Sequence, residues 1–481
     1  MPQNMNRRDF LRAVGVGAAY LSTPSVTIGR PRPTPQKKKY PNLLIIHTDQ
    51  LSCWALSIYA KQLTRTPNYG KILVKTPHID SLAEEGAIFY NFFTNSAVCT
   101  PSRGCLISGR YPHAHGAYRN NIEMNRDEVT IAHILQSNGY ETGYAGKWHL
   151  DGTPKPGWVK PERSMDFADC RFMFNRGHWK KIVEQPEGSP KVSPYKVIGD
   201  KKTFTTDWLA DKTIEFIKKP RRKPFFYMVS IPDPHGPFTV REPYMSMYQP
   251  EDMTVPNNFK VSSAKKGRKK TKEQMKKSKA HYCGLVKCID DNVGRILDAL
   301  KDKRILDDTI IIFTTDHGEY MGEHGLYGKN QWYRTAYQIP FLVRWPEKIR
   351  PGTVINNFVT NVDVQQTLLG LIKIKPCRRE QGRDASGLLR GEKTEWANEA
   401  MIHHSSLESA GIFTPEYELV LKANGDHMLF DRLNDPEQMK NLNNNPDYKQ
   451  VIKNLAERVL RHNIEVNAPA ASWLKPTVNE L

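Results

Sequence analysis

Side chains that bind metals follow two of the apolar segments that we predict to be buried strands. Carboxylate and amide oxygens suit Ca²⁺ or Mg²⁺, and an imidazole nitrogen also admits Mn²⁺ or Zn²⁺. The four side chains are Asp49 and Gln50 after residues 43–46, and Asp316 and His317 after residues 309–314. Loops often contain such pairs for hydrogen bonding alone, so their position directly after a strand is what favours a metal site.

Two further segments are followed by groups that transfer protons or neutralise anions. Lys147 and His149 follow the segment near residues 140–145, and His235 follows residues 224–231. In a doubly wound sheet, ligands bind outside the carboxyl ends of the strands. We therefore expect the lysine and the histidines at the same edge as the carboxylates, although either histidine taken singly is equally consistent with a structural role.

The segment Cys99-Thr100-Pro101-Ser102-Arg103-Gly104 gives the strongest local signal. Proline suits the first turn of a helix, so Cys99 is predicted at the positive end of a helix, where an anion is favoured. Arg103 follows four residues later on the same face, where its guanidinium can hold an anionic side chain. A plain helix cap is the other interpretation of this segment.

The same segment, followed by Leu106-Ile107-Ser108-Gly109-Arg110-Tyr111, resembles the Cys-x-Pro-Ser-Arg signature of the formylglycine-dependent type I sulfatases, in the alkaline phosphatase superfamily. The resemblance covers nearly all of the chain after residue 39. Within the family, the chain resembles bacterial polysaccharide sulfatases. Its other motifs are Thr76–Gly86, Gly146-Lys147-Trp148-His149, Thr315-Asp316-His317-Gly318-Glu319, Gly325-Leu326-Tyr327-Gly328-Lys329, and Phe430-Asp431 with Asp435-Pro436-Glu437 and Asn441-Leu442. Several ordered motifs together make a plain helix cap a poor explanation.

The resemblance implies an enzyme that hydrolyses sulfate esters. In this family a maturase converts the signature cysteine to formylglycine (3-oxoalanine), so Cys99 would be the modified residue and its hydrate would supply the attacking hydroxyl. Asp49, Gln50, Asp316 and His317 would hold Ca²⁺, with Mg²⁺ or Mn²⁺ as alternatives. Two positions depart from the pattern of many members, because Gln50 replaces a second aspartate and His317 replaces the asparagine of some.

The resemblance also implies roles for the catalytic side chains. Arg103 would hold the modified residue, and Lys147 and Lys329 would neutralise the sulfate oxygens. His235 would protonate the leaving alcohol, and His149 would take the proton from the second hydroxyl of the hydrate, which expels sulfate. A plain serine or cysteine is not enough: a sulfate ester on a simple hydroxyl would hydrolyse slowly, whereas the geminal hydroxyl expels the sulfate from within.

Strands that alternate with helices predict an α/β fold with a doubly wound, mostly parallel sheet flanked by helices. A capped helix is expected at 76–86. The last part of the sequence is rich in turns and predicts strands at 418–421 and 428–430 and a helix at 448–462. We divide the chain into a signal and linker (1–39), a catalytic domain (40–350) and a smaller C-terminal α+β subdomain (351–481).

The N-terminus has the pattern of a bacterial twin-arginine export signal. Asn6-Arg7-Arg8-Asp9-Phe10-Leu11-Arg12 precedes an apolar run at 13–21 that is too short to cross a bilayer. A linker rich in proline and lysine follows at 30–39. We expect a periplasmic or secreted protein without stable membrane insertion; the other interpretation of the apolar run is an amphipathic surface helix.

Composition and charge favour a globular protein with an anionic partner. Of the 481 residues 39% are hydrophobic, and the formal net charge is +19, a sign that fits a polyanion. The export signal and the lack of a nucleic-acid-binding motif disfavour nucleic acid. Seven cysteines, an odd number, do not make a disulfide framework. Five are expected to be ordinary buried residues, namely Cys53, Cys170, Cys283, Cys288 and Cys377.

Export and positive charge together favour a sulfated polysaccharide, or its oligosaccharides, over a small aryl sulfate. Algal polymers such as ulvan, carrageenan and fucan fit, and so do animal glycosaminoglycans. Arg176, His178 and Trp179 are predicted to form a sugar subsite, with an ordinary polar-aromatic loop as the alternative. The basic run at 265–279 is either a solvated segment or a contact for the anionic polymer.

Two other functions fit parts of the pattern. A phosphodiester or phosphonate monoester hydrolase of the same superfamily can use the same nucleophile. A non-catalytic binder of sulfated glycans would keep only the fold. The intact set of reactive residues argues against such a binder; the set is Cys99, Arg103, Lys147, His149 and His235.

Overall fold

An eight-stranded sheet forms the centre of the fold. The computed structural model describes residues 40–63, 71–153, 157–260 and 270–481. In spatial order the strands are β11 (Thr353–Ile355), β2 (Ala87–Phe89), β10 (Phe341–Arg344), β9 (Thr309–Thr315), β1 (Asn42–Asp49), β8 (Phe225–Pro234), β4 (Glu141–Lys147) and β5 (Asp169–Phe174). Only the two pairings of β10 are antiparallel. The predicted doubly wound, mostly parallel sheet is therefore confirmed.

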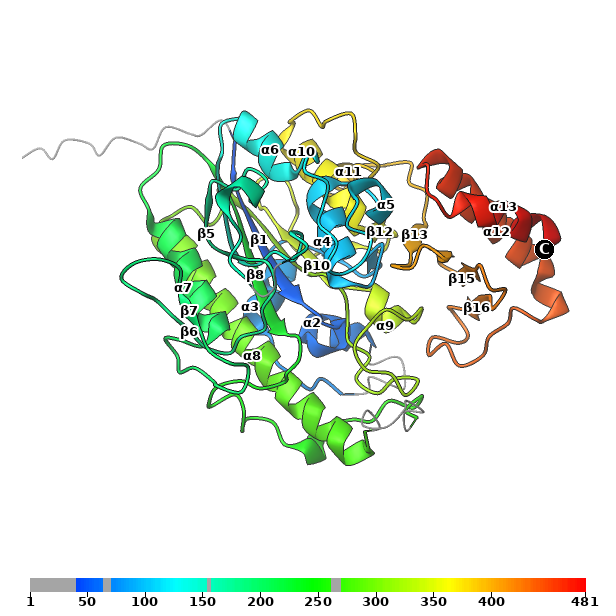
Figure 1. Cartoon of the computed structure of the whole chain (residues 1–481), viewed down its shortest axis with the longest axis horizontal. Coiled ribbons are helices and arrows are strands. Elements are labelled where there is room, and N and C mark those ends of the chain that lie inside the picture. The colour runs from blue at the N-terminus through cyan, green and yellow to red at the C-terminus, as the bar shows by residue number, and fades with distance from the viewer. Residues whose placement is uncertain (1–39, 64–70, 154–156, 261–269) are drawn as a thin grey trace, which may run out of the picture. The chain divides into compact units, whose positions relative to one another are not determined.

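Helices cover both faces of this sheet, as the side chains of β1 show. Leu44 and Ile46 enter one apolar cluster, whereas Leu43 and Ile45 enter another on the opposite face. The first cluster includes residues of α2 (Ser57–Leu63), α3 (Pro77–Glu84), α7 (Thr205–Lys218) and α8 (Lys272–Asp302) (Figure 1). The second includes residues of α4 (Cys99–Ser108), α6 (Ile131–Ser137), α10 (Val364–Ile372) and α11 (Ser386–Leu389). A strand buried on both faces is apolar throughout, which makes it recognisable in the sequence.

The predicted local elements form with small shifts at their ends. The helix expected at 76–86 is α3, which has proline at its start, and the strand-like run after it divides into β2 and β3 (Phe92–Phe93). The smaller two-stranded sheets pair β3 with β12 (Val359–Thr360) and β6 (Ile182–Val183) with β7 (Lys191–Val192). Two short helices, α5 (Pro112–His115) and α9 (Arg334–Tyr337), lie in the loops.

The C-terminal subdomain is built on a second, antiparallel sheet. Its elements are β13 (Ala400–His403), β14 (Ser409–Phe413), β15 (Tyr417–Lys422), β16 (Met428–Asp431), α12 (Lys449–Glu465) and α13 (Ala471–Glu480). The helices and the sheet share an apolar cluster. The boundary that we placed at 350/351 is too early, because β11 pairs with β2 in the large sheet and α10 packs against that sheet. Pairing between such distant segments leaves no local mark in the sequence.

Several sequence expectations concern residues at the margins of the described chain. The signal and linker at 1–39, and residues 265–269 of the basic run, lie outside the described residues; residues 272–279 form the first turns of α8. All seven cysteines are unpaired, and of the five expected to be buried only Cys377 is half-exposed. Among the described helices, none is both long and apolar enough to cross a membrane.

Histidines from three elements meet where the C-terminal subdomain contacts the catalytic domain. His403 of β13 and His462 of α12 each lie 4.8 Å from Tyr111, measured between ring centroids, and His113 of α5 stacks on the same tyrosine. Burial lowers the pKa of His403 well below its ordinary value, and burial, with help from the nearby His113 and Arg383, lowers the pKa of His462 to about 4. The folded protein therefore keeps these imidazoles neutral.

Acid should weaken this contact. Below the ordinary histidine pKa of about 6.5, the unfolded chain takes up protons that the folded chain excludes, so stability falls as pH falls. For His462 the loss between pH 7 and pH 5 should be about 2 kcal/mol. His462→Phe keeps a ring against Tyr111 but removes the titrating group. In urea unfolding we expect the free energy of unfolding to fall by about 2 kcal/mol less between pH 7 and pH 5 in this variant than in the unaltered protein. His78→Gln, which removes an exposed imidazole, is the control, and equal losses in both variants would contradict this account.

Candidate active site

Four adjacent parallel strands bring the predicted site residues to one edge of the sheet. β9, β1, β8 and β4 are neighbours in that order, so their carboxyl ends open onto the same space. The residues at or directly after these ends are Asp316 and His317, Asp49 and Gln50, His235, and Lys147 and His149. The N-terminus of α4 adds Cys99 from the side. The structure therefore brings together the catalytic and metal-binding residues expected from the sequence.

Arg103 connects the parts of this site. Its side chain is 2% exposed, and its guanidinium pairs with Asp316 Oδ2 at 3.0 Å and Asp49 Oδ2 at 3.3 Å. It also donates to the Ser230 hydroxyl at 2.7 Å and the Lys147 carbonyl at 2.8 Å. Burial opposes its charge, but Asp316 and Asp49 outweigh burial and raise the pKa of Arg103. Among the described residues its polar contacts are thus with the two carboxylates, Ser230 and Lys147. From the sequence we expected Arg103 to hold the modified residue 99, and that role stays a prediction.

A cluster of acidic and softer ligands surrounds Cys99. One ligand atom from each of Asp49, Cys99, Asp316 and His317 lies within 4.8 Å of the others, and all four residues are buried. The Cys99 Sγ lies 3.2 Å from His317 Nε2 and 3.8 Å from Asp49 Oδ1. Two fully buried carboxylates beside a histidine form a donor set that suits a divalent cation. These residues therefore fit the metal site predicted from the sequence.

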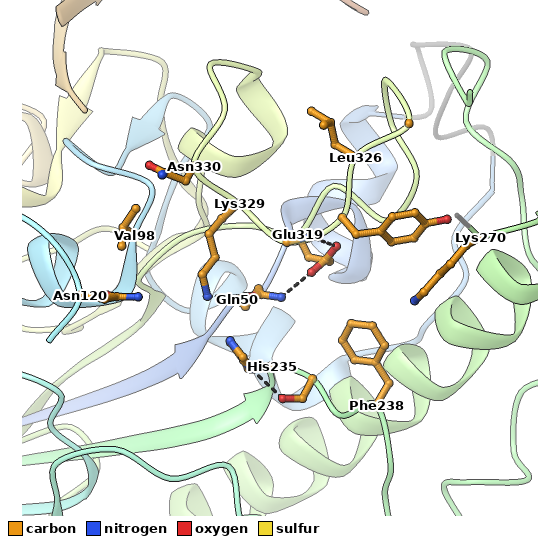
Figure 2. Close-up of a pocket in the computed structure, with 14 residues that line it drawn as sticks. Gln50, Val98, Asn120, His235, Phe238, Lys270, Glu319, Leu326, Lys329 and Asn330 are labelled. Atoms are coloured by element: carbon orange, nitrogen blue, oxygen red, sulfur yellow. Dashed lines mark hydrogen bonds between the residues drawn. The ribbon is translucent and has the colours of Figure 1, made fainter. Parts of the chain in front are cut away.

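Gln50 contacts this cluster through its backbone N–H, and hydrogen bonds hold both ends of its side-chain amide. Its backbone N–H donates to Asp316 Oδ1 at 2.9 Å, and its side-chain Nε2 donates to Glu319. Its Oε1 accepts from Lys329 Nζ at 2.7 Å. The carboxylate of Glu319 is itself fixed, because Oε1 accepts the N–H groups of Met321 and Gly328. Glu319 is a site residue that we did not single out from the sequence, although it ends the motif Thr315-Asp316-His317-Gly318-Glu319. Figure 2 shows its contact with Gln50.

Cationic groups approach the thiol from the other side. Lys329 Nζ lies 3.2 Å from Cys99 Sγ, and Lys147, fully buried, pairs with Asp49. Burial and Asp49 would raise the pKa of the Cys99 thiol, but Lys147, Lys329 and His317 outweigh them and hold that pKa well below its ordinary value. Residue 99 therefore occupies a position that stabilises negative charge.

Three histidines lie around this position in neutral form. His178 and His235 stack with 3.8 Å between ring centroids and 5° between planes, and His178 Nε2 is 3.1 Å from Lys147 Nζ. Burial lowers the pKa of His178 to about 3 and that of His235 well below its ordinary value. Burial also lowers the pKa of His149 to about 4, against an opposing effect of Cys99. Neither ring nitrogen of His149 makes a hydrogen bond of ordinary geometry among the described residues.

The predicted sugar subsite at 176–179 does not form as a unit. Trp179 is 5% exposed and packs in the core against Phe174 and Trp158, at 5.0 and 6.1 Å between ring centroids. It is therefore a core residue rather than a sugar contact. His178 lies among the reactive groups beside Lys147. Arg176 is exposed, outside the lining of the pocket described next.

A pocket of about 840 Å³ opens over the reactive groups. Lys329, Gln50 and His235 form part of its wall, and Figure 2 shows Phe238 and Lys270 on the side away from Lys329 and Asn120. The remaining lining residues are Val98, Gly236, Glu319, Gly325, Leu326, Tyr327, Gly328 and Asn330. The volume is typical of a small-molecule site, so a substrate larger than one sulfate group has room beside Cys99.

Comparison with known proteins decides the family. The family model described as Sulfatase matches residues 41–374, and the model described as N-sulphoglucosamine sulphohydrolase, C-terminal, matches residues 322–465. This chain belongs to the sulfatase family. It is accordingly a sulfuric ester hydrolase with an alkaline-phosphatase-like fold.

The matches to individual relatives cover most of this sulfatase. The ulvan-active sulfatase of Formosa agariphila is 29% identical over 85% of this chain and 78% of its own length. The N-acetylglucosamine-6-O-sulfatase of Bacteroides thetaiotaomicron is 24% identical over 88% of this chain and 86% of its own length. A solved structure from Bacteroides fragilis, named as a sulfatase (yidJ), superposes with a TM-score of 0.76 at 25% identity and covers 92% of this chain and 99% of its own.

The Gln50–Glu319 contact generates a prediction about this sulfatase. Many family members have aspartate at this position, and Gln50→Asp would place a second carboxylate beside buried Glu319. Two buried like charges repel, so the folded state would lose stability. We expect Gln50→Asp to lower the melting temperature in EDTA, and Glu319→Gln in the same chain to recover a large part of the loss. A coupling free energy of about 1 kcal/mol or more is expected from the double-mutant cycle. Simple additivity of the two single effects would count against the contact.

Proposed function

We propose that this sulfatase removes sulfate esters from a sulfated polysaccharide or its oligosaccharides. The observation that carries the proposal is the position of Cys99, which lies between Lys329 and the Asp49–Asp316–His317 cluster. Lys329 also lines the neighbouring pocket. The polymer is supported by the charge of +19 and by the names of two relatives, which act on ulvan and on N-acetylglucosamine 6-O-sulfate groups. Ulvan, carrageenan and glycosaminoglycans are the candidate polymers.

We propose that Cys99 is converted to formylglycine by a maturase that acts on this chain. Hydrated formylglycine would supply one hydroxyl to attack sulfur and a second to expel the sulfate. The support is local: residue 99 begins α4, where helix N–H groups favour an anion, and Lys147, Lys329 and His317 favour negative charge there. An unmodified thiol offers no second hydroxyl.

The neighbouring side chains would bind sulfate and move protons. Lys329 and Lys147 lie where they would neutralise the oxygens of a sulfate held over residue 99. His235 lines the pocket, where the negative charge of a bound sulfate would favour its protonated form, so it would donate a proton to the leaving alcohol. His149 lies close enough to Cys99 to interact with it and would take the proton from residue 99. His178, stacked on His235, would keep that ring in its orientation.

Asp49, Gln50, Asp316 and His317 would hold the metal, which we propose to be Ca²⁺, with Mg²⁺ or Mn²⁺ as alternatives. A bound divalent cation would draw in a sulfate oxygen and polarise the ester. The described donors suit such an ion because both carboxylates are buried and point at one volume. Gln50 would contribute its amide oxygen, which Glu319 orients from the other end of the amide.

Metal binding should be visible in thermal stability. After EDTA treatment, CaCl₂ should raise the melting temperature, since a ligand at a hundredfold excess over Kd stabilises the folded state by about 2.7 kcal/mol. Asp316→Asn should abolish the rise, whereas Asp298→Asn, on the exposed surface of α8, should keep it. A rise of the same size in both variants would place the ion elsewhere.

We propose that the sulfatase acts outside the cytoplasm, in the periplasm or after secretion. The support is the twin-arginine pattern at residues 6–12 and the linker at 30–39. A large polymer cannot enter a bacterial cytoplasm intact, so an exported enzyme matches a polysaccharide substrate. Fractionation of cells that express the full chain, beside Arg7→Lys/Arg8→Lys, tests this: retention of the variant alone in the cytoplasm is expected.

Sulfate release tests the function directly. The chain is coexpressed with a formylglycine-generating maturase and incubated with ulvan, carrageenan, fucan and glycosaminoglycans, and released sulfate is measured by ion chromatography. We expect release from at least one polymer and none from Cys99→Ala. If mass spectrometry finds formylglycine at residue 99 but no polymer loses sulfate, while a phosphate diester or phosphonate monoester is hydrolysed, the phosphodiesterase alternative replaces this proposal.

A further inference from the structure

The pocket that Lys329 lines carries positive charge at two separate places. Lys329 lies beside the thiol, whereas Lys270 lies on the opposite side of the pocket with Phe238 (Figure 2). The Lys270 amine is 4.5 Å from the ring centroid of Tyr327 and 5.8 Å from that of Phe238. The second place thus combines one ammonium group with two aromatic rings.

The ammonium group of Lys270 has no carboxylate partner among the described residues. Its hydrogen bond goes to the neutral hydroxyl of Ser278 at 3.1 Å. Among the described residues that line the pocket, Glu319 is the one acid, and its charge favours the protonated form of Lys270. No ion pair joins the two side chains, because the carboxylate oxygens of Glu319 accept from Gln50 and from the N–H groups of Met321 and Gly328. A half-buried cation without an acidic partner attracts an anion more strongly than an exposed one, because less water screens it.

We propose that Lys270, Phe238 and Tyr327 form a subsite for a second anionic group of the substrate. The inference rests on the proposed function and specifies its substrate class: a sulfated sugar with a further carboxylate or sulfate, on the same ring or on the neighbouring one. The apolar face of the sugar packs on the two aromatic rings, and Lys270 pairs with the anion. One sulfate lies over residue 99, and the other anion lies across the pocket.

The size of the pocket agrees with this occupant. About 840 Å³ is near the upper part of the range for small-molecule sites, which leaves room for a second sugar beside the one that loses its sulfate. Such a pocket needs few polar groups to fix orientation. Charge at both ends selects a doubly anionic saccharide over a neutral or singly charged one, and the aromatic rings between supply contact area that does not depend on the position of the hydroxyls.

A charge-removing variant separates this role from the chemistry. Lys270→Gln keeps a group that can bond to Ser278 but loses the positive charge. Lys272→Gln, at the exposed start of α8, is the matched control. Both are assayed on two doubly anionic substrates: a sulfated disaccharide with a uronate carboxylate, and a disulfated disaccharide whose carboxyl is reduced to an alcohol. The two singly anionic substrates are the monosulfated disaccharide with the reduced carboxyl and para-nitrophenyl sulfate.

We expect Lys270→Gln to lower kcat/KM for the doubly anionic substrates about tenfold more than for the singly anionic ones, through KM rather than kcat. Comparison of the carboxylate and disulfate arms tells which anion the subsite prefers. Lys272→Gln should change none of these ratios. The same relative loss on all substrates, or no loss, would overturn the subsite.

Calorimetry in a Cys99→Ala background keeps the subsite apart from the proposed function, because binding needs no turnover. A weaker affinity of the Lys270→Gln chain for the doubly anionic disaccharide supports the subsite even if the unaltered protein releases no sulfate, a result that would reject only the proposed reaction. Equal affinities with and without Lys270 would reject the subsite even if sulfate is released.

Discussion

The buried guanidinium of Arg103 is the interaction on which the site depends. Asp49 and Asp316 end adjacent parallel strands, so the sheet forces two carboxylates together away from water. Two such charges repel and cannot both stay ionised without a cation between them. Arg103 pairs with both, and it also belongs to the helix that begins at Cys99. One side chain therefore fixes the acidic pair and the start of the helix at Cys99 with respect to each other.

A buried charge is tolerated only with partners, and this requirement explains the density of ionic groups at the strand ends. Lys147 pairs with Asp49, and Lys329 lies against Cys99. Each of these cations lowers the free-energy cost of burying the negative charge beside it. His178 and His235 stay neutral because burial disfavours their charged form, and the nearby Lys147 and Lys329 add to that effect. A neutral imidazole can accept a proton, whereas the raised pKa values of Lys329 and Arg103 keep these two groups charged. The proposed roles follow this division, because the groups that hold charge differ from those proposed to move protons.

The sequence was informative wherever one local pattern determines position. β1, β8 and β9 were recognisable as continuous apolar runs, so the residues after them could be placed at one edge of the sheet, and proline near Cys99 indicated the start of α4. Long-range contacts left no such pattern. Nothing near residue 353 shows that β11 pairs with β2. The loop at 176–179 contains a tryptophan and a histidine in succession, and only tertiary packing decides that Trp179 enters the core while His178 reaches Lys147.

The groups proposed for chemistry and those proposed for recognition lie on different parts of the fold. The reactive groups stand on strand ends and on α4, which the core holds rigidly, whereas Phe238, Tyr327 and Lys270 stand on the connecting segments. Connecting segments change without disturbing the sheet, so the same centre can serve different glycans. The net charge of +19 attracts any polyanion at long range and cannot choose among them. For the proposed polymer substrate, selection must therefore arise at contact distance, and the proposed subsite places a few such groups across the pocket from Lys329.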